Sequence, residues 1–314
     1  MTESPRKSGL ARFVARYAVP LMAMQNVIWG ASYLAADIAL KEMTPDVTAA
    51  WRFLFTTVLM AVILFARRTP VRMKRTDYGL AAVMGFVGIA VSYVLVYEGI
   101  LYSSATDRAL ASPLEPVILA LMGAVFLRER LNRRQVGGIV LAFIGAYLLA
   151  ARSAISGEGW QPRYAVGMAL ILLAFFTESL VSLIGKPLVD RYHPLSVTTW
   201  AMAFGALFLM VECTVRTGFP QLPTRPETWW ALAFLVIPCT VIGYTLWYAC
   251  LEHMPVGVIG AFIFIQPVVG FALGMAFEGQ KLSIPLLSGA VLICLGVYLT
   301  GRQHKPDEIT EPSA

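Results

Sequence analysis

Long apolar stretches, separated by short polar connections, follow one another along almost the whole chain. Ten of them have the length of roughly 20 mainly apolar residues that a helix needs to cross a bilayer. They cover residues 17–40, 47–66, 78–97, 104–126, 135–151, 164–185, 197–215, 228–250, 255–277 and 285–301. The strands of a transmembrane barrel would alternate polar and apolar residues, which these stretches do not. We therefore predict an all-α membrane protein with ten transmembrane helices.

The composition agrees with lipid as the surrounding solvent. Apolar residues make up 58% of the 314 residues, and Asp, Glu, Lys and Arg together only 14%. Soluble domains average roughly 45–50% apolar and about 25% charged residues. This imbalance excludes secreted disulfide scaffolds, disordered tails and most cytosolic enzymes. The short connections also leave no room for a soluble catalytic domain, so we do not expect an enzyme.

Basic residues set the expected orientation. The formal net charge is +6, and the Lys and Arg residues collect in runs beside the apolar stretches. If the N-terminus faces the cytoplasm, most of the 25 Lys and Arg residues lie in cytoplasmic segments, as the positive-inside rule requires. We therefore predict cytoplasmic tails at 1–16 and 302–314 in a multi-pass protein of the cell inner membrane. The first apolar stretch is expected to stay as a helix and not to be removed as a signal peptide, and no nucleic-acid partner is expected.

No metal or cofactor site is expected. The four cysteines, Cys213, Cys239, Cys250 and Cys294, form no C-x-x-C pair, and the three histidines are scattered. Neither residue type has the clustered spacing of metal ligands. The sequence also lacks a nucleotide-binding P-loop, so direct use of ATP is not indicated.

An internal repeat divides the chain into two halves. One constant shift along the sequence aligns prolines and glycines of the first half with identical residues of the second. The aligned pairs are Pro116 with Pro267, Gly123 with Gly274, Gly138 with Gly289, and Gly145 with Gly296. Each half, 17–151 and 164–301, holds five predicted helices, so the second half enters the membrane from the opposite side. Inverted repeats of this kind build alternating-access carriers whose site lies near the membrane midplane.

Several short motifs occur in a distinctive order. They are Trp29-Gly30, Arg52-Phe53, Leu114-Glu115-Pro116, Arg128-Glu129-Arg130-Leu131, Gly137-Gly138 and Gly145. With these motifs in this order and spacing, the chain resembles the drug/metabolite transporter superfamily and, within it, the EamA-type transporters. The resemblance implies a helical bundle with a central cavity that exports small metabolites, amino acids or drugs. The second half departs from the pattern at Gln266-Pro267 and at Glu278-Gly279-Gln280-Lys281, so the substrate does not follow from the resemblance.

Glu115 is the main candidate for the chemistry of transport. A charged group at the bilayer centre costs about 2.5–3.5 kcal/mol on insertion scales, so it needs a structural or functional reason. Arg108, Ser112 and Glu115 are spaced to share one helical face, which we expect to form part of a substrate-binding cavity wall. Glu115 is also the candidate proton-coupling group, because burial favours the protonated form of a carboxylate. The alternative is that Glu115 caps backbone groups left free by Pro116.

Arg52 and the pair Asp107-Arg108 lie at similar depths near the outer ends of their predicted helices. An ion pair between Arg52 and Asp107 would hold two helices together, and a buried ion pair is a weak indicator of function. Alternatively, Arg52 or Arg108 meets a carboxylate of the substrate. The positions of the second half that correspond to Arg52, Arg108 and Glu115 carry no charge, and they are Ala201, Ile259 and Gln266.

Aromatic and helix-breaking residues complete the candidate site. The aromatic side chains that are candidates for lining the cavity and stacking on a ligand are Trp29, Tyr33, Tyr244, Trp247 and Phe262. The alternative is that these rings only pack or lie at the membrane interface. Gln266 stands where the first half has Glu115 and is a further candidate, and Glu178 is a lesser one. Pro116 and Pro267 are expected to break or kink their helices and so expose carbonyl groups to a ligand.

Together these features predict a secondary-active transporter that exports a small metabolite, such as an amino acid-like compound or a drug, by alternating access. An importer or facilitated exchanger, a membrane-embedded enzyme, and an accessory subunit without transport activity are the alternatives. The expected partners are a small-molecule substrate and the lipid bilayer, and a homodimer is left open.

Overall fold

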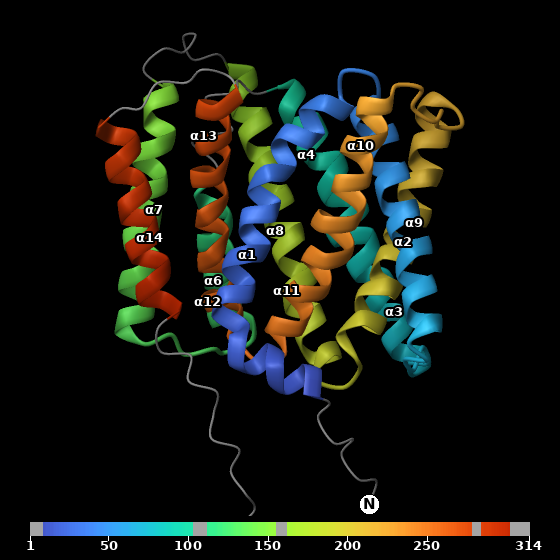
Figure 1. The fold of residues 1–314 in the computed structure, drawn as a ribbon, viewed down its shortest axis with the longest axis horizontal. Helices are drawn as coiled ribbons and strands as arrows, with labels where there is room; N and C mark the ends of the chain where they lie inside the picture. Colours follow the sequence, from blue (N-terminus) through green and yellow to red (C-terminus); the bar gives the residue numbers. More distant parts are fainter. Residues whose placement is uncertain (1–8, 103–111, 155–161, 278–283, 302–314) are drawn as a thin grey trace, which may run out of the picture.

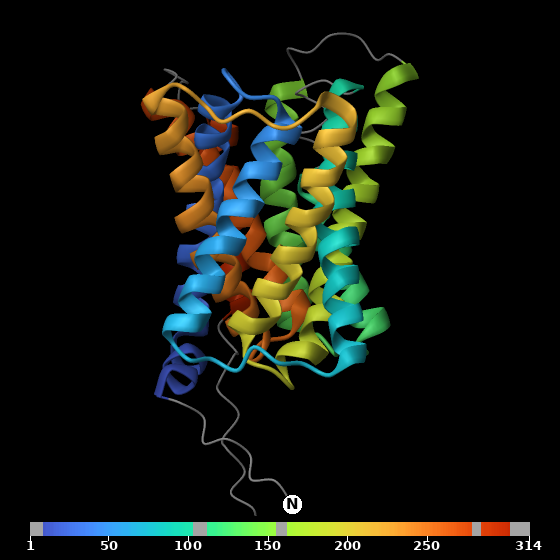
Figure 2. The same cartoon turned by 90° about the vertical axis from the view of Figure 1, so that its right-hand side faces the viewer.

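The structure, a computed structural model, describes residues 9–102, 112–154, 162–277 and 284–301, and within these ranges every regular element is a helix. The helices stand side by side with their axes roughly aligned and form one bundle (Figures 1 and 2). The first helix begins, and the last described helix ends, at the same end of this bundle (Figure 1). An all-helical arrangement of this kind agrees with the sequence pattern.

The helices of the two halves follow one another with short connections. Those of the first half are α1 (Gly9–Ala39), α2 (Pro45–Ala66), α3 (Arg75–Gly85), η1 (Phe86–Val91), α4 (Ser92–Leu101), α6 (Leu114–Phe126) and α7 (Arg133–Ala154). Those of the second half are α8 (Pro162–Val189), α9 (Pro194–Thr217), α10 (Pro226–Phe234), η2 (Leu235–Ile242), α11 (Gly243–Leu251), α12 (Val256–Ala261), η3 (Phe262–Phe264), α13 (Ile265–Phe277) and α14 (Ile284–Gly301). Pro45, Pro194 and Pro226 open their helices, because the first helical turn does not use the N–H group that proline lacks.

Five of the described helical segments are long and apolar enough to cross a membrane. They are Pro45–Ala66, Arg75–Val96, Ala165–Val189, Pro194–Thr217 and Pro226–Leu251, and Leu114–Phe126, Val256–Gly270 and Leu287–Gly301 are shorter apolar helices. Large apolar side chains also cover the outside of the bundle: Phe65 is 88% exposed and Val215 is 80% exposed. Surfaces of this kind are unfavourable in water and natural in lipid. The chain is therefore a multi-pass membrane protein.

Three helical segments change their winding along their length. The segments η1 and η2 are π-helical turns inside α3–η1–α4 and α10–η2–α11, and the shift that aligns the two halves brings them to corresponding positions. The segment η3 is a 3₁₀ turn that ends three residues before Pro267. Because Pro267 cannot donate a backbone hydrogen bond to Ile263, the regular winding is lost there. Turns of the π type often mark functional sites in helices.

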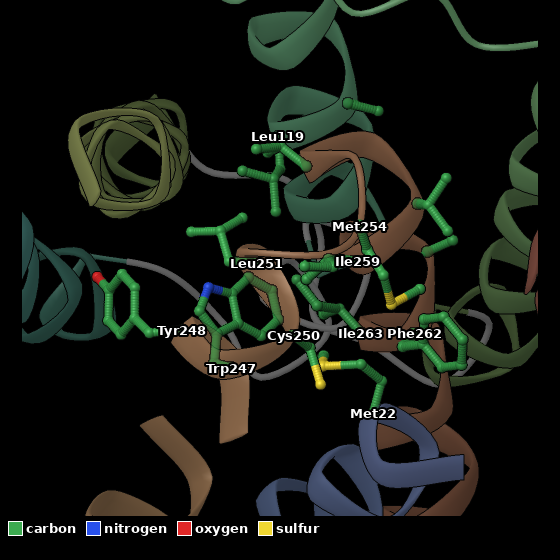
Figure 3. Close-up of a cluster of buried hydrophobic side chains, with 14 of the residues drawn as sticks. Met22, Leu119, Trp247, Tyr248, Cys250, Leu251, Met254, Ile259, Phe262 and Ile263 are labelled. Atoms are coloured by element: carbon green, nitrogen blue, oxygen red, sulfur yellow. The ribbon is translucent and has the colours of Figure 1, made fainter. Parts of the chain in front are cut away.

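The largest apolar cluster joins helices from both halves. Figure 3 shows Met22 of α1, Leu119 of α6, Trp247 of α11 and Phe262 of η3 converging on one buried region. Met22 and Phe262 are at most 1% exposed. Residues far apart in the sequence thus form one continuous core in the middle of the bundle.

Glycines bring α7 and α14 into close contact. A Cβ atom on Gly138 would lie 2.6 Å from the carbonyl oxygen of Gly296, and one on Gly145 would lie 2.6 Å from that of Gly289. The contact order is reversed between the two helices, so α7 and α14 run in opposite directions. Small residues at such crossings let helix backbones approach closely in lipid, where dispersion contacts replace the hydrophobic effect.

Side chains from one half cap helix ends of the other. The two carboxylate oxygens of Glu129 accept hydrogen bonds from the N–H groups of Val256 (3.0 Å) and Gly257 (3.4 Å), which open α12. A second cap involves Glu42, which accepts hydrogen bonds from the backbone N–H and the hydroxyl of Thr224, just before α10. Hydrogen bonds from Thr228 and Thr224 lower the pKa of Glu42 to about 2. These caps connect the two halves outside the apolar segments.

Candidate functional site

An internal cavity lies where α1, η1, α6, α8, α9, α11 and η3 meet. It contains about 520 Å³ of space not filled by protein atoms, open solvent at its mouth included. Its wall joins acidic, aromatic and small polar side chains with apolar ones: Trp29, Gly88, Ile89, Glu115, Leu119, Glu178, Ser179, Val181, Ser182, Ala201, Met202, Tyr244, Trp247, Tyr248 and Ile263. A mainly apolar pocket with a few convergent polar groups is the usual form of a small-molecule site.

Two carboxylates face this cavity from different halves of the chain. Glu115 lies in the first turn of α6, and Glu178 lies on α8. The two groups interact electrostatically with each other. Intramembrane carboxylates that face a bundle interior typically belong to an ion or substrate path. Their meeting in one wall makes this cavity the candidate site.

Arg52 reaches toward the same region from α2 and binds the π-helical turn η2. Its Nε donates a 2.8 Å hydrogen bond to Oγ1 of Thr240, whose hydroxyl donates in turn to the carbonyl oxygen of Leu235 (2.7 Å). Arg52 also hydrogen-bonds the hydroxyl of Tyr93 and interacts electrostatically with Glu178. Arg52 is therefore part of a polar network behind the cavity wall and is not among the residues that line it.

The aromatic part of the wall is fixed by hydrogen bonds of its own. The indole N–H of Trp29 donates to the carbonyl oxygen of Cys239 (2.7 Å), and that of Trp247 donates to Oγ of Ser182 (3.1 Å). The ring centroids of Trp29 and Trp247 are 5.4 Å apart in a stacked arrangement, and those of Trp29 and Tyr244 are 5.1 Å apart. These bonds hold the rings in position without a ligand.

The other predicted site residues lie elsewhere or beyond what the structure describes. Gln266 is buried, and its Nε2 donates a 3.0 Å hydrogen bond to Oδ1 of Asn26 on α1. Phe262 packs in the core of Figure 3 and is absent from the cavity wall. Ser112 precedes α6 and likewise does not line the cavity. Arg108, its neighbour Asp107 and the side chain of Tyr33 fall outside the described part of the chain.

Pro116 and Pro267 differ in their surroundings. Pro116 is buried in the first turn of α6, where its missing N–H is not needed by the helix. Pro267 lies in the first turn of α13, directly after the 3₁₀ turn η3. Near the cavity, the carbonyl oxygen of Cys239 accepts a hydrogen bond from the indole N–H of Trp29. Cys239 directly follows Pro238 in η2.

Some residues of the cavity wall can be recognised in the sequence as candidate site residues, and others cannot. Glu178 is an acid within an apolar stretch, and Ser179 and Ser182 follow it on α8. By contrast, Ala201 and Met202 look like ordinary residues of an apolar helix. In the described ranges, no three His, Cys, Asp or Glu side chains come close enough to hold a metal ion.

Comparison with known proteins gives a consistent result over nearly the whole chain. The EamA-like transporter family matches it twice, over residues 16–151 and 165–302. An uncharacterized transporter of Archaeoglobus fulgidus is 26% identical, with 90% of this chain and 98% of that protein covered. A probable amino-acid metabolite efflux pump of Salmonella typhimurium is also 26% identical, with 87% and 91% covered.

A further relative and a solved structure agree with these matches. A probable terminal-alkyne amino-acid exporter of Streptantibioticus cattleyicolor is 25% identical, with 91% of this chain and 94% of that protein covered. A solved crystal structure superposes with a TM-score of 0.78 at 20% identity, covering 91% of this chain and 96% of that one. At that identity the superposition establishes a shared fold.

Proposed function

Because the chain belongs to the EamA-like transporter family, we propose that it is a secondary-active exporter of a small metabolite in the cell inner membrane. The single observation that carries this proposal is the cavity between the halves, whose wall brings together Glu115 and Glu178. The names of the amino-acid exporter and efflux-pump relatives support an outward direction and an amino acid-like or drug-like solute.

The proposed topology has ten transmembrane helices in two inverted repeats, 17–151 and 164–301, with cytoplasmic tails at 1–16 and 302–314. Two observations support it. The glycine contacts of α7 and α14 pair Gly138 with Gly296 and Gly145 with Gly289, and these two pairs exchange when the halves are exchanged. The π-helical turns η1 and η2 also correspond. Inverted repeats related in this way can expose a central site to each side in turn.

The proposed site for the substrate is the cavity and its immediate surroundings. Its proposed binding residues are Trp29, Tyr33, Arg52, Arg108, Ser112, Glu115, Tyr244, Phe262 and Gln266. In this arrangement the aromatic rings stack on the apolar part of the solute, and the charged groups recognise its polar part. Arg52 acts on the solute through the network that it forms with Thr240 and Tyr93.

Glu115 is the proposed proton-coupling group. It takes up a proton when the cavity is open to one side and releases it when the cavity is open to the other, so proton flow drives solute export. Glu178 lies within electrostatic range of Glu115, and two neighbouring carboxylates disfavour being charged at the same time.

Two measurements test this function. First, metabolites in the medium are compared between cells that lack the protein and cells that overproduce it; the expected result is at least one small solute that rises outside the overproducing cells. No change in any solute would contradict an export role.

Second, the purified protein is reconstituted with that solute and a pH-sensitive dye in proteoliposomes. The variant Glu115→Gln should abolish solute-driven proton movement, because an amide cannot carry the proton. Glu212→Gln on α9 is the matched control, since Glu212 pairs with Arg216 and does not line the cavity. Unchanged proton movement in Glu115→Gln would rule out the coupling role.

A further inference from the structure

The cavity wall is acidic in the part of the chain that the structure describes. Among the described residues that line it, Glu115 and Glu178 are acidic, and no Lys, Arg or His is present. Glu115 interacts electrostatically with Glu178, and Glu178 interacts electrostatically with Arg52. A buried carboxylate without a compensating group is unfavourable. The wall is therefore complementary to one further positive charge.

Arg52 does not remove this imbalance. It is the described cation that interacts electrostatically with Glu178, and it is hydrogen-bonded to Thr240 behind the wall. One guanidinium can balance one of the two carboxylates. Once the second carboxylate has released its proton, it is available to a positive charge that enters the cavity.

Two hydrogen-bond donors of the wall are not available to an anion. The indole N–H groups of Trp29 and Trp247 are both used by protein acceptors. The side chain of Ser179 lines the cavity and is only 3% exposed. Its hydroxyl oxygen can accept a hydrogen bond from an ammonium group. The wall therefore also offers a neutral acceptor to a cationic ligand.

Aromatic faces provide the remaining element of recognition. Trp29, Tyr244 and Trp247 form one continuous aromatic surface beside the carboxylates. The faces of such rings attract cations, most strongly where water is excluded, and also bind aromatic or apolar groups. The same surface can therefore hold both the charged head and the apolar body of one molecule.

We propose that the ligand of this cavity is a singly charged organic cation, an amine with an aromatic or apolar body, which the carboxylates of Glu115 and Glu178, the hydroxyl of Ser179 and the aromatic surface bind together. This proposal rests on the transport function proposed above and specifies its substrate class.

The test compares two probes of the same shape and opposite charge. Phenethylamine and 3-phenylpropionate both carry a phenyl ring on a two-carbon chain, one ending in an ammonium group and the other in a carboxylate. Their binding to the purified full-length protein in detergent is measured by isothermal titration calorimetry at neutral pH. We expect phenethylamine to bind at least about tenfold more tightly. Equal affinity, or tighter binding of 3-phenylpropionate, would overturn the proposal.

Variants of the wall show whether the carboxylates are responsible. Glu115→Gln and Glu178→Gln should each weaken phenethylamine binding, and the double variant should abolish it. Glu115→Asp and Glu178→Asp should restore part of the affinity, which a variant that merely misfolds would not do. Glu212→Gln is the control and should bind normally. Normal phenethylamine binding by the double Gln variant would contradict the proposal.

Failure of the proposed substrate class can be distinguished from failure of the proposed transport function. If the protein transports a solute in proteoliposomes but does not prefer phenethylamine, the substrate class is wrong and the transporter role stands. If phenethylamine binds as expected but no solute crosses the membrane, the binding site stands and the transporter role fails.

Discussion

The charged residues inside the helical bundle fall into two groups. Those of the first group bind protein atoms: Lys186 donates from Nζ to the carbonyl oxygens of Leu251 (2.8 Å) and Met254 (3.0 Å) at the end of α11. Those of the second group, Glu115 and Glu178, face the cavity. The first group satisfies backbone groups that lipid cannot satisfy. The second group faces the cavity instead, and this difference singles it out for function.

A residue at the start of α9 makes stability depend on pH. Nδ1 of His193 accepts a 3.2 Å hydrogen bond from the N–H of Leu195, so this cap requires an unprotonated Nδ1. Burial lowers the pKa of His193 below its ordinary value of 6.5. As the pH falls below about 6.5, the unfolded chain takes up the proton first. The stabilisation present above this pH is therefore lost as the pH falls through the lower pKa of the folded protein.

The variant His193→Asn isolates this effect, because asparagine is a good N-cap and does not titrate. Between pH 8 and pH 5, the unmodified protein should lose more stability than His193→Asn, by up to about 1 kcal/mol, the usual contribution of an N-cap. Thermal unfolding of both proteins in detergent measures the difference. Parallel pH profiles would mean that the cap does not depend on the protonation of His193.

At this scale the sequence predicts some wall residues and misses others. Trp29, Glu115 and Tyr244 stand out as polar or aromatic residues within apolar stretches, and the structure has all three in the cavity wall; their binding role stays a prediction. The partner of Arg52 could not be foreseen, since Thr240 faces it only through the π-helical turn η2. Phe262 is also aromatic, but it lies in the 3₁₀ turn η3 and packs in the core.

At the scale of elements, periodicity predicts where helices lie but not where their winding changes. The predicted stretch 47–66 corresponds to α2, Pro45–Ala66. The turns η1 and η2 leave no trace in the apolar pattern, because one extra residue per turn does not alter an all-apolar stretch. Only Pro238 in η2 and Pro267 after η3 give a local reason for irregular winding.

Two neighbouring glycines of α7 provide a matched test of helix packing. A Cβ atom on Gly138 would collide with Thr300 and with the backbone of Gly296 on α14, whereas one on Gly137 would have no atom within 4 Å. Gly138→Ala should lower the free energy of unfolding by about 1–3 kcal/mol, because backbone atoms must shift. Gly137→Ala should be neutral or stabilise by up to about 1 kcal/mol, because alanine favours the helix.

Unfolding in detergent micelles, followed by circular dichroism, measures both variants under the same conditions. Equal effects of the two substitutions would show that α7 and α14 do not pack as the structure has them. A destabilisation confined to Gly138→Ala would support the close antiparallel crossing that relates the two halves.

At the scale of the whole molecule, the sequence predicts the helical class and the family, which the comparisons confirm. Composition and motif order are properties of the whole sequence, so they can be recognised without knowledge of the fold. The cavity cannot be predicted in this way, because its wall joins α1, η1, α6, α8, α9, α11 and η3, and the meeting of these segments depends on how the helices cross. Ala201 and Met202 belong to the wall for this reason alone.

The central claim is that this cavity opens alternately to the two sides of the membrane. Ser179→Cys puts a thiol of nearly the same size into the wall, in a chain whose four native cysteines are replaced by alanine. A membrane-impermeant maleimide is then applied to intact cells and, separately, to inside-out vesicles. The account predicts that the thiol reacts from both sides and that phenethylamine slows both reactions. A thiol that reacts from one side only, or from neither, would contradict it.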